Sequence, residues 1–464
     1  MEQSVIHRTI TVAPGRFAPG HLGELTQQVP FEMVDAVLAQ TGRLQSRLRD
    51  LPARVVVYLL LAGCLFAELG YVGVWHRLTA GLDGLQVATP TASALTQARR
   101  RLGAGPLRGL FDLLCGPAPV AATGGVRIGG LLVCAIDGTT LSVADTPANR
   151  AAFCKQPGNH GGSGYPLLRL VALVACGTRS LIAAVYGPTT AGETTYTDRL
   201  TASLHAGMLV LCDRNLTTNT LTRHLAASGA HLLGRCKTDR KLPVLRRLDD
   251  GSYLSILGGV NIRVVQAEII IATSAGRATA SYRLATTLTD PHTWPAATLV
   301  ALYHQRWEIE TAYLELKSSI LGGRVLRART PQGIDQEVYA LLVCYQLLRL
   351  AMADATSTQA GIDPDRASFT IALHTARDQL IQAAGVLAST TVDLIGKIGR
   401  QVLDNLLPDR RLRVSPRIVK RAISKYNARG PTINRTSYKA TVSIHILSPP
   451  LDTPPRTLTT RHWD

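Results

Sequence analysis

Apolar residues recur at helical spacing near the start of the chain. The segments ELTQQVPFEMVDAVLAQTG and ARVVVYLLLAGCLFAE carry this pattern, and TASALTQARRRLG ends in basic residues followed by a glycine. Such spacing is typical of amphipathic helices, and glycine commonly follows the last helical residue. We therefore predict an all-helical N-terminal domain over residues 21–115, preceded by a flexible, Pro- and Gly-interrupted segment over residues 1–20.

From residue 128 the pattern changes to short apolar runs bounded by Gly, Asp or Asn. These runs predict buried strands: GGLLVCAIDGTTLSVAD, LLRLVALVACGTRSLIAAVYG, GMLVLCDRN and AHLLGRCKTD. Between them, GETTYTDRLTASLHAG and NLTTNTLTRHLAASG have helical spacing and glycine stops. Strands that alternate with helices indicate an α/β core, and its first part covers residues 128–240.

The α/β pattern is interrupted before it resumes. Residues 241–296 alternate apolar and polar positions around glycine turns, which predicts an inserted β-rich domain. Helical spacing returns over residues 297–355, which we assign to the second part of the core. The C-terminal region, 356–464, is predicted to be helical and then increasingly polar, with a strongly basic stretch at 408–430.

The charge balance narrows the class of partner. The chain of 464 residues holds 50 Lys and Arg against 32 Asp and Glu, a formal net charge of +18. A surplus of this size favours a polyanionic partner, most simply nucleic acid. The hydrophobic fraction of 46% is that of a folded protein and excludes a disordered one.

Compartment follows from the apolar runs and the cysteines. The most apolar run, residues 55–67, is too short to span a bilayer, and the N-terminus lacks a signal-peptide pattern. The eight cysteines are scattered, without a C-x-x-C pair, and most lie in apolar runs. Buried reduced thiols are favoured over disulfides or zinc ligands. We expect a cytoplasmic protein with no membrane contact.

The segment YHQRWEIETAYLELK aligns chemically different groups on one predicted helix. At about 100° per residue, Tyr303, Arg306, Glu310 and Lys317 fall within an arc of about 60°. An acid, two cations and a phenol would thus share one ridge beside an apolar stripe. The alternative is a solvated helix face with an ordinary Arg306–Glu310 pair. Trp307 lies near the same face, although it is equally compatible with a core position.

Two more carboxylates follow buried strands. Asp137 ends the run LLVCAID, and Asp213 ends GMLVLCD. The carboxyl ends of strands in open α/β sheets are where ligands and catalytic groups collect. Capping of the next turn is the commoner role for a single such aspartate. Together with Glu310, however, these residues form a trio of hard oxygen ligands suited to Mg²⁺ or Mn²⁺.

These residues resemble the insertion sequence 4 family of DDE transposases. The helical segment matches that family's Y-x(2)-R-x(3)-E-x(6)-K pattern. AIDGTTLSVAD and GMLVLCDRN resemble its first and second aspartate regions, and ELTQQVPFEMVDAVLAQTG is similar to its N-terminal domain. The four-residue pattern is moderately specific alone and much more specific behind two aspartates in this order.

The resemblance implies a fold and a mechanism. The fold would be a ribonuclease-H-like core with the β-rich domain inserted between Asp213 and Glu310. Asp137, Asp213 and Glu310 would be catalytic acids that hold two Mg²⁺ ions, with Mn²⁺ as a substitute, about 4 Å apart. The expected activity is cutting of an insertion element's ends and joining of those ends to target DNA by strand transfer.

The resemblance also implies the DNA contacts and the assembly. Arg306, Lys317 and Tyr303 would contact phosphates near the cut, and Trp307 would stack on an unpaired base. Arg214, beside Asp213, would contact DNA or pair with a carboxylate. The helical domain of residues 21–115 would bind DNA. The expected partners are double-stranded terminal inverted repeats and target DNA. A homodimer would hold the two ends in a synaptic complex.

Two other functions fit part of the pattern. One is a ribonuclease-H-like nuclease or resolvase that cuts without joining strands. The other is a DNA-binding derivative that no longer cuts, against which the intact acid trio argues. Inverted repeats flanking the gene would favour the transposase over both.

Overall fold

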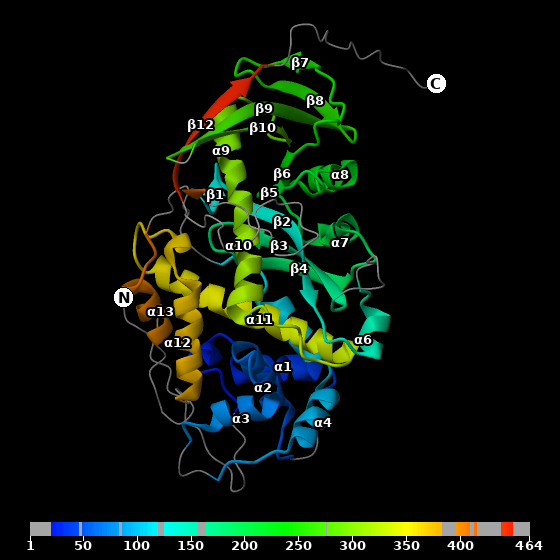
Figure 1. Cartoon of the computed structure of the whole chain (residues 1–464), viewed down its shortest axis with the longest axis vertical. Coiled ribbons are helices and arrows are strands. Elements are labelled where there is room, and N and C mark those ends of the chain that lie inside the picture. Colours follow the sequence, from blue (N-terminus) through cyan, green and yellow to red (C-terminus); the bar gives the residue numbers. More distant parts are fainter. Residues whose placement is uncertain are drawn as a thin grey trace. The chain divides into compact units, whose positions relative to one another are not determined.

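The computed structural model describes residues 20–45, 49–82, 86–118, 125–155, 164–274, 276–382, 396–408, 413–414 and 438–448 (Figure 1). The chain forms two compact units. The first consists of Met1–Ser203 and Arg306–Leu407, and the second of Leu204–Gln305 and Pro408–Asp464. The segment expected to be flexible, 1–20, lies outside the described residues except for Gly20, as does most of the basic stretch 408–430.

The N-terminal part of the first unit is helical, as predicted. Its described α-helices are α1 (Phe31–Gln40), α2 (Ala53–Leu65), α3 (Tyr71–Thr79), α4 (Ala92–Leu102) and α5 (Gly105–Leu114). Every residue of α2 except Arg54 is buried, because this helix is apolar on all sides. The apolar run of 55–67 is therefore mostly a core helix. Six of the eight cysteines are buried and all eight are free thiols, as the sequence predicts.

The first unit also contains an antiparallel sheet. β2 (Leu131–Ser142) pairs with β1 (Arg127–Ile128) and β3 (Leu167–Ala175), and β3 pairs with β4 (Leu181–Pro188). The prediction that the first strand ends at Asp137 is wrong. β2 runs on to Ser142 because residues 138–142 continue to pair with β3. What changes at Asp137 is burial: the five residues before it are buried, and the next four positions, beginning with it, are half-buried.

Three further helices complete the core of the first unit within the described residues. α11 (Pro331–Ser357) packs against α2 and α5, and also contacts α12 (Phe369–Ile381) and α13 (Gly396–Asp404). In Figure 1, α11 lies between the N-terminal helices and the β2–β4 sheet. By length and composition α11 is apolar enough to cross a membrane, but 78% of its apolar window is buried inside the protein, as in the core helix of a globular domain. Short helices α6 (Pro147–Ala152) and α7 (Glu193–Arg199) flank the sheet strands in sequence.

The second unit contains a further group of strands. β5 (Met208–Cys212) and β6 (His231–Arg235) run parallel, joined by α8 (Asn219–Ser228). β6 pairs with β10 (Gly276–Thr286), and β10 pairs with the long strand β9 (Val260–Thr273). The second unit also contains β7 (Arg246–Arg247), β8 (Tyr253–Leu257) and α9 (Ala296–Tyr303). The β-rich character expected for residues 241–296 is thus observed from β7 to β10.

The C-terminal region contains a strand that the sequence does not predict. β12 (Tyr438–Leu447) pairs antiparallel with residues 266–273 of β9, and β11 (Arg413–Val414) pairs with β12. None of the residues of β12 is buried. The helices expected in this region are present as α12 and α13, whereas its later, polar part contributes β11 and β12, which extend the sheet of β9 and β10.

Candidate active site

Asp137 lies on β2 at the point where the strand leaves the buried core. Opposite it on β3, in register, is Ala172. One carboxylate oxygen of Asp137, Oδ1, accepts a hydrogen bond from the backbone N–H of Gly138 at 2.8 Å. The other oxygen, Oδ2, faces the guanidinium group of Arg306 at 3.3 Å. Asp137 is thus oriented by its own strand on one side and by a cation on the other.

Arg306 joins Asp137 to Glu310. Its second terminal nitrogen donates to Glu310 Oε1 at 2.9 Å, one helical turn along α10 (Trp307–Leu314). The side chains of Arg306 and Asp137 are 14% and 18% exposed, so this is more than the solvated pair considered above. Two carboxylates that are 173 positions apart in sequence therefore share one cation.

Tyr313 fixes α10 against the sheet at the level of Asp137. Its hydroxyl donates to the backbone carbonyl of Asp137 at 2.6 Å and accepts from the backbone N–H of Ala172 at 3.1 Å. Burial, and secondarily the charge of Asp137, raise the pKa of Tyr313 well above its usual value, so the phenol stays neutral and can donate. One side chain thus ties the helix of Glu310 to both residues of the Asp137–Ala172 pair.

The segment around Glu310 is not the single α-helix that the sequence predicts. α9 ends at Tyr303, a 3₁₀ turn covers His304–Arg306, and α10 gives way to a π-helix over Glu315–Ile320. The wider turn begins at Glu315, a buried carboxylate held by two arginines. Because the angular step per residue changes twice, the predicted arc cannot be extended to all four residues. Lys317, on the π-helix, donates to the hydroxyl of Thr139 on β2 at 3.2 Å.

A further carboxylate, Glu193, lies against the backbone next to Asp137. It is the first residue of α7, and Arg169 lies 3.8 Å from its Oε1. A Cβ added at Gly138 would come within 2.0 Å of the same oxygen. The absence of a side chain at Gly138 is therefore what allows Glu193 to approach β2.

Asp213 and Tyr303 belong to the second unit. Asp213 follows the last residue of β5, and its Oδ1 accepts from the backbone N–H groups of Asn215 and Leu216, each at 2.8 Å. This is the turn-capping role weighed in the sequence analysis. Tyr303 is buried, and its hydroxyl donates to the carbonyl of Cys212 at 2.9 Å, directly before Asp213. Arg214 is exposed in the turn.

Trp307 is not a core residue. Its side chain is 42% exposed, and Leu314, seven positions along α10, is 59% exposed. The guanidinium of Arg306 lies 5.6 Å from the centre of the Trp307 ring. The core alternative for Trp307 is therefore wrong, and its accessible aromatic ring lies next to Arg306.

Asp137 and Glu310 supply hard oxygen donors. Among the described residues no three His, Cys, Asp or Glu side chains come together as a metal site. The carboxylates of Asp137 and Glu310 instead converge on the positive charge of Arg306. Oxygen atoms that already share a cation suit Mg²⁺ or Mn²⁺ chemically, provided that the guanidinium gives way.

Comparison with known families identifies the family of this chain. Residues 19–112 match the family described as insertion element 4 transposase N-terminal, and residues 128–347 match the transposase DDE domain. The chain belongs to the insertion sequence 4 family of DDE transposases. It is an insertion-sequence transposase, an enzyme of metal-dependent DNA cleavage and transfer, and divalent metal ions are general in its family.

Named relatives cover much of the transposase. It is 27% identical over 410 residues to the transposase InsG for insertion sequence element IS4 of Escherichia coli K12, covering 85% of this chain and 91% of the relative. It is 27% identical over 207 residues to the putative transposase InsZ of the same organism, covering 44% and 68%. A piggyBac transposase, solved by cryo-electron microscopy as a synaptic complex with hairpin DNA, aligns with a TM-score of 0.41 and 11% identity, covering 83% and 85%.

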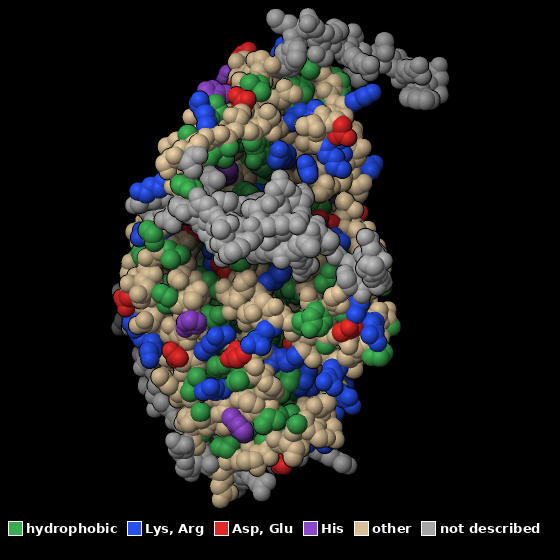
Figure 2. Space-filling view, in the orientation of Figure 1, with side chains coloured by type: hydrophobic (Ala, Val, Ile, Leu, Met, Phe, Trp, Pro, Cys, Tyr) green, Lys and Arg blue, Asp and Glu red, His purple; other side chains and the backbone are tan. Residues whose placement is uncertain are grey.

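Charge on the surface of the transposase fits a DNA partner. On the face drawn in Figure 2, blue Lys and Arg side chains are more prominent than red Asp and Glu over the helices of the first unit. α4 contributes Arg99, Arg100 and Arg101 and contains no acidic residue. The net charge of +18 is therefore displayed in part on the N-terminal helices.

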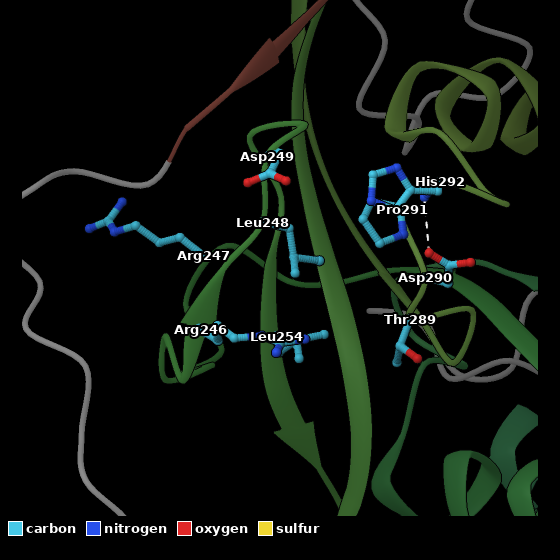
Figure 3. A pocket seen from close by; sticks show the side chains of 9 residues that line it. All are labelled: Arg246, Arg247, Leu248, Asp249, Leu254, Thr289, Asp290, Pro291 and His292. Atoms are coloured by element: carbon cyan, nitrogen blue, oxygen red, sulfur yellow. Dashed lines mark hydrogen bonds between the residues drawn. The ribbon is translucent and has the colours of Figure 1, made fainter.

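A hollow in the second unit of the transposase lies apart in sequence from the predicted site residues. Its volume is about 560 Å³, and Figure 3 shows its lining: Arg246, Arg247, Leu248, Asp249, Leu254, Thr289, Asp290, Pro291 and His292. Asp290 Oδ1 accepts from the backbone N–H of His292 at 3.0 Å, so this carboxylate caps its own turn. None of the predicted catalytic or DNA-binding residues lines this hollow.

Two residues of the site are not among those predicted from the sequence. Tyr313 lies within YHQRWEIETAYLELK, and Glu193 lies within the predicted helical segment GETTYTDRLTASLHAG. The helix start at GET is a local signal, because an acidic residue in a first turn is favoured by the helix dipole. Its approach to Gly138 depends on tertiary packing that no local pattern encodes.

Proposed function

We propose that Asp137, Asp213 and Glu310 are the catalytic acids of this transposase and hold two Mg²⁺ ions, for which Mn²⁺ can substitute. The observation that carries the proposal is the shared cation between Asp137 and Glu310. When bound, the ions would supply Lewis-acid activation of the attacking hydroxyl and stabilise the leaving oxygen. The family's ribonuclease-H-like core, with the β-rich insertion between Asp213 and Glu310, would be the frame for this site.

The residues around the acids would position DNA. Arg306 would exchange its carboxylate partners for a phosphate beside the cut, and Lys317 would hold a neighbouring phosphate. Trp307, exposed beside Arg306, would stack on an unpaired base. Arg214, exposed in the turn after Asp213, would contact the DNA backbone.

Tyr303 has a different geometry from these DNA contacts. Its buried hydroxyl is bonded to Cys212, so holding the strand end before Asp213 is the role its contacts support best. A phosphate contact by Tyr303 stays a prediction from the resemblance.

We further propose that the helical N-terminal region binds the element's ends through α4. The exposed face of this helix carries Ser93, Thr96, Gln97 and Arg100. Arg, Gln, Ser and Thr are side-chain types that contact base edges in the major groove, and the neighbouring positive charge suits phosphates. The DNA partners would be terminal inverted repeats and target DNA. A homodimer would hold both ends, acting on the nucleoid in the cytoplasm.

The test of the acids is end cleavage by purified variants. Asp137→Asn, Asp213→Asn and Glu310→Gln should each abolish Mg²⁺-dependent nicking and strand joining on end DNA while binding stays measurable. Asp404→Asn, an exposed carboxylate at the end of α13, is the matched control and should cleave normally. Robust cleavage by any of the three site variants would remove that residue from the proposal.

The test of α4 compares end DNA with scrambled DNA. Gln97→Ala and Arg100→Ala should each reduce the preference for end DNA by about 1–3 kcal/mol, because base contacts carry the specificity. Arg108→Ala, an exposed change on α5, is the control for charge alone. Equal losses on both DNAs would show that α4 does not read sequence.

Nicking without strand joining by the unaltered protein would instead support the nuclease alternative. Binding without any nicking would support the non-cutting derivative.

A further inference from the structure

Arg179 occupies an unusual place in the first unit. It lies in the tight turn between β3 and β4, and it is the only non-glycine residue with a positive φ (57°) among those the structure describes. A side chain in this left-handed region is strained by about 1 kcal/mol, and glycine would avoid the strain. Strain retained at a non-glycine residue points to a use for its side chain.

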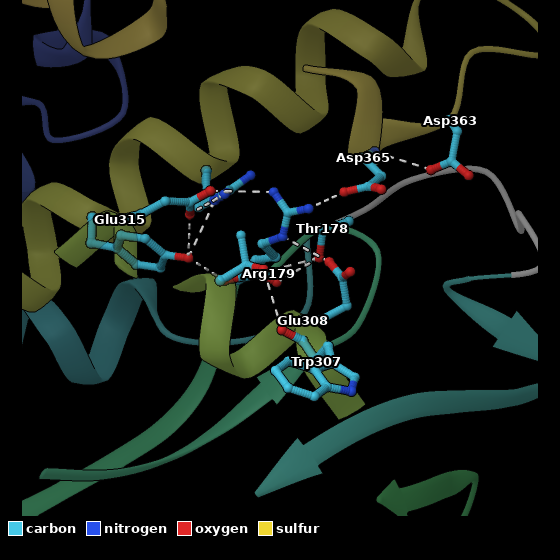
Figure 4. Close-up of polar contacts among 11 residues, drawn as sticks. Thr178, Arg179, Trp307, Glu308, Glu315, Asp363 and Asp365 are labelled. Carbon is cyan, nitrogen blue, oxygen red and sulfur yellow. Dashed lines mark hydrogen bonds and ion pairs between the residues drawn. The ribbon is translucent and has the colours of Figure 1, made fainter. Parts of the chain in front are cut away.

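The guanidinium of Arg179 is surrounded by carboxylates (Figure 4). Nε donates to Glu308 Oε2 at 2.7 Å, and one terminal nitrogen donates to Glu315 Oε1 at 3.2 Å. The other terminal nitrogen pairs with Asp365, in the 3₁₀ turn Pro364–Arg366. Burial by itself would lower the pKa of Arg179, but these carboxylates raise it above its usual value, so the group stays charged.

Glu308 and Glu315 lie on the side of the helical segment away from Glu310. They are seven positions apart, which is close to two α-helical turns, so they share one side. Glu310 is two positions from Glu308, about 200° around the helix, and faces Arg306 and Asp137 instead. Arg179 therefore binds the side of this helical segment opposite to Glu310, the proposed catalytic glutamate.

Residues of α11 also hold Glu315 and Arg179 in place. The second oxygen of Glu315 pairs with Arg349 and accepts from the Tyr345 hydroxyl, 3.1 Å away. Tyr345 also lies 3.1 Å from the backbone carbonyl of Arg179. Glu315 is the first residue of the π-helix that carries Lys317, so the same contacts set the position of that lysine. Short π-helical segments inside α-helices occur frequently at functional sites.

Stability alone does not account for this network. Buried ion pairs are commonly no more stabilising than apolar residues of similar volume, because desolvation offsets the attraction. What a planar guanidinium with several directed donors supplies is a fixed geometry. We infer that Arg179 is a positioning residue of the transposase, holding α10 and the π-helix so that Glu310 and Lys317 face Asp137. This inference rests on the proposed function of Glu310 and Asp137.

The first experiment compares Arg179→Lys with Arg263→Lys. Arg263 is the matched control because it is also a buried arginine, paired with Asp250, but it belongs to β9 in the second unit. Both changes should lower the melting temperature. Only Arg179→Lys should slow single-turnover end cleavage, by roughly tenfold to hundredfold, as outer-shell changes do at metal sites. Its affinity for end DNA should fall by no more than the Lys317→Ala change produces.

A second readout does not depend on activity. Calorimetric titration of Mn²⁺ into the free protein should show weaker binding in Arg179→Lys, since a displaced Glu310 presents a poorer donor set. Arg263→Lys should bind Mn²⁺ as the unaltered protein does. If Arg179→Lys matches Arg263→Lys in both cleavage and Mn²⁺ affinity, Arg179 is only structural and the inference is overturned.

A charge-compensated variant guards against simple misfolding. Arg179→Met combined with Glu308→Met removes the buried pair as a whole and should recover much of the stability lost by Arg179→Met alone. Cleavage should remain slow, because the contact between Arg179 and Glu308 no longer holds α10 in place. Recovery of both stability and cleavage would overturn the inference. Glu310→Gln separates the two claims: normal cleavage by Glu310→Gln defeats the proposed function, whereas an inactive Glu310→Gln beside a fully active Arg179→Lys defeats this inference only.

Discussion

The hydroxyl of Tyr313 bridges the backbone of the Asp137–Ala172 pair, donating to Asp137 and accepting from Ala172. The helix that carries Glu310 is thereby fastened to the strand that carries Asp137. Arg179 fastens the opposite side of the same helix through Glu308. The two proposed catalytic carboxylates thus owe their proximity to contacts on both sides of one helix.

Tyr313→Phe is expected to reduce both stability and cleavage. Losing the hydroxyl leaves a buried N–H and a carbonyl without this partner, which costs about 1–3 kcal/mol. Urea unfolding measures this loss, and single-turnover cleavage should slow by about tenfold. Tyr165→Phe, at a position that is 50% exposed, is the control and should change neither. Unaltered cleavage by Tyr313→Phe would show that its hydroxyl does not set the site.

Arg306→Gln is expected to strengthen metal binding while slowing cleavage. Arg306 and a metal ion compete for Asp137 and Glu310, and a charge-assisted hydrogen bond is worth about 1.5 kcal/mol, or on the order of tenfold in affinity. Calorimetric titration of Mn²⁺ into DNA-free protein measures the gain. Arg54→Gln, which breaks an ion pair with Asp35, is the control. Weaker Mn²⁺ binding by Arg306→Gln would show that Arg306 orients the carboxylates and does not compete for them.

Lys317→Ala is expected to weaken DNA binding in a salt-dependent way. Removing one phosphate contact should reduce the slope of log affinity against log salt by about one unit. Fluorescence anisotropy with end DNA at several salt concentrations measures the slope. Lys397→Ala, an exposed lysine on α13, is the comparison variant. A slope identical to that of the unaltered protein would remove Lys317 from the phosphate contacts.

His21 is expected to make the protein less stable in mild acid. Nδ1 of this buried imidazole is 3.3 Å from the N–H of Gly23, and Nε2 is 3.1 Å from the carbonyl of Leu78. Burial lowers the pKa of His21 below 6.5, so the unfolded chain takes up the proton first. Its contribution to stability is complete above pH 6.5 and declines as the pH falls toward the folded-state value.

The measurement is the free energy of unfolding at about pH 7.5 and about pH 5.5, on either side of the ordinary histidine pKa. His21→Gln should lose less stability between them than the unaltered protein does. His76→Gln, at an exposed position on α3, controls for the removal of an imidazole. Equal acid sensitivity in His21→Gln and the unaltered protein would contradict the prediction.

The sequence predicts those parts of the fold in which local periodicity determines the structure. The helices of residues 21–115 and the strands before Asp137 and Asp213 follow from the spacing of apolar residues. The apolar stripe beside Glu310 is also buried as expected, at Leu302, Ile309, Leu316 and Ile320. β12 was missed although YKATVSIHIL alternates with period two, because its setting in a polar region favoured a different interpretation.

The candidate site was less predictable where distant contacts decide geometry. The sequence places Arg306 and Glu310 one helical turn apart, and their pairing follows from that spacing. It contains no local sign that Arg306 also reaches Asp137, or that Arg179 reaches Glu308 and Glu315. The 3₁₀ and π segments likewise depend on tertiary partners of the helix, such as those of Glu315.

The late position of β12 in the sequence also affects folding during translation on the ribosome. The edge of β9 that ends at Thr273 pairs with β12, which begins at Tyr438, 165 residues later in the chain (438 − 273). At about 5–20 residues per second, that edge stays uncovered for roughly 8–33 s of translation. An exposed strand edge is a template for pairing with other chains. Chains translated from mRNAs truncated before residue 438 should therefore aggregate, and they should not act as inhibitors of the full-length transposase.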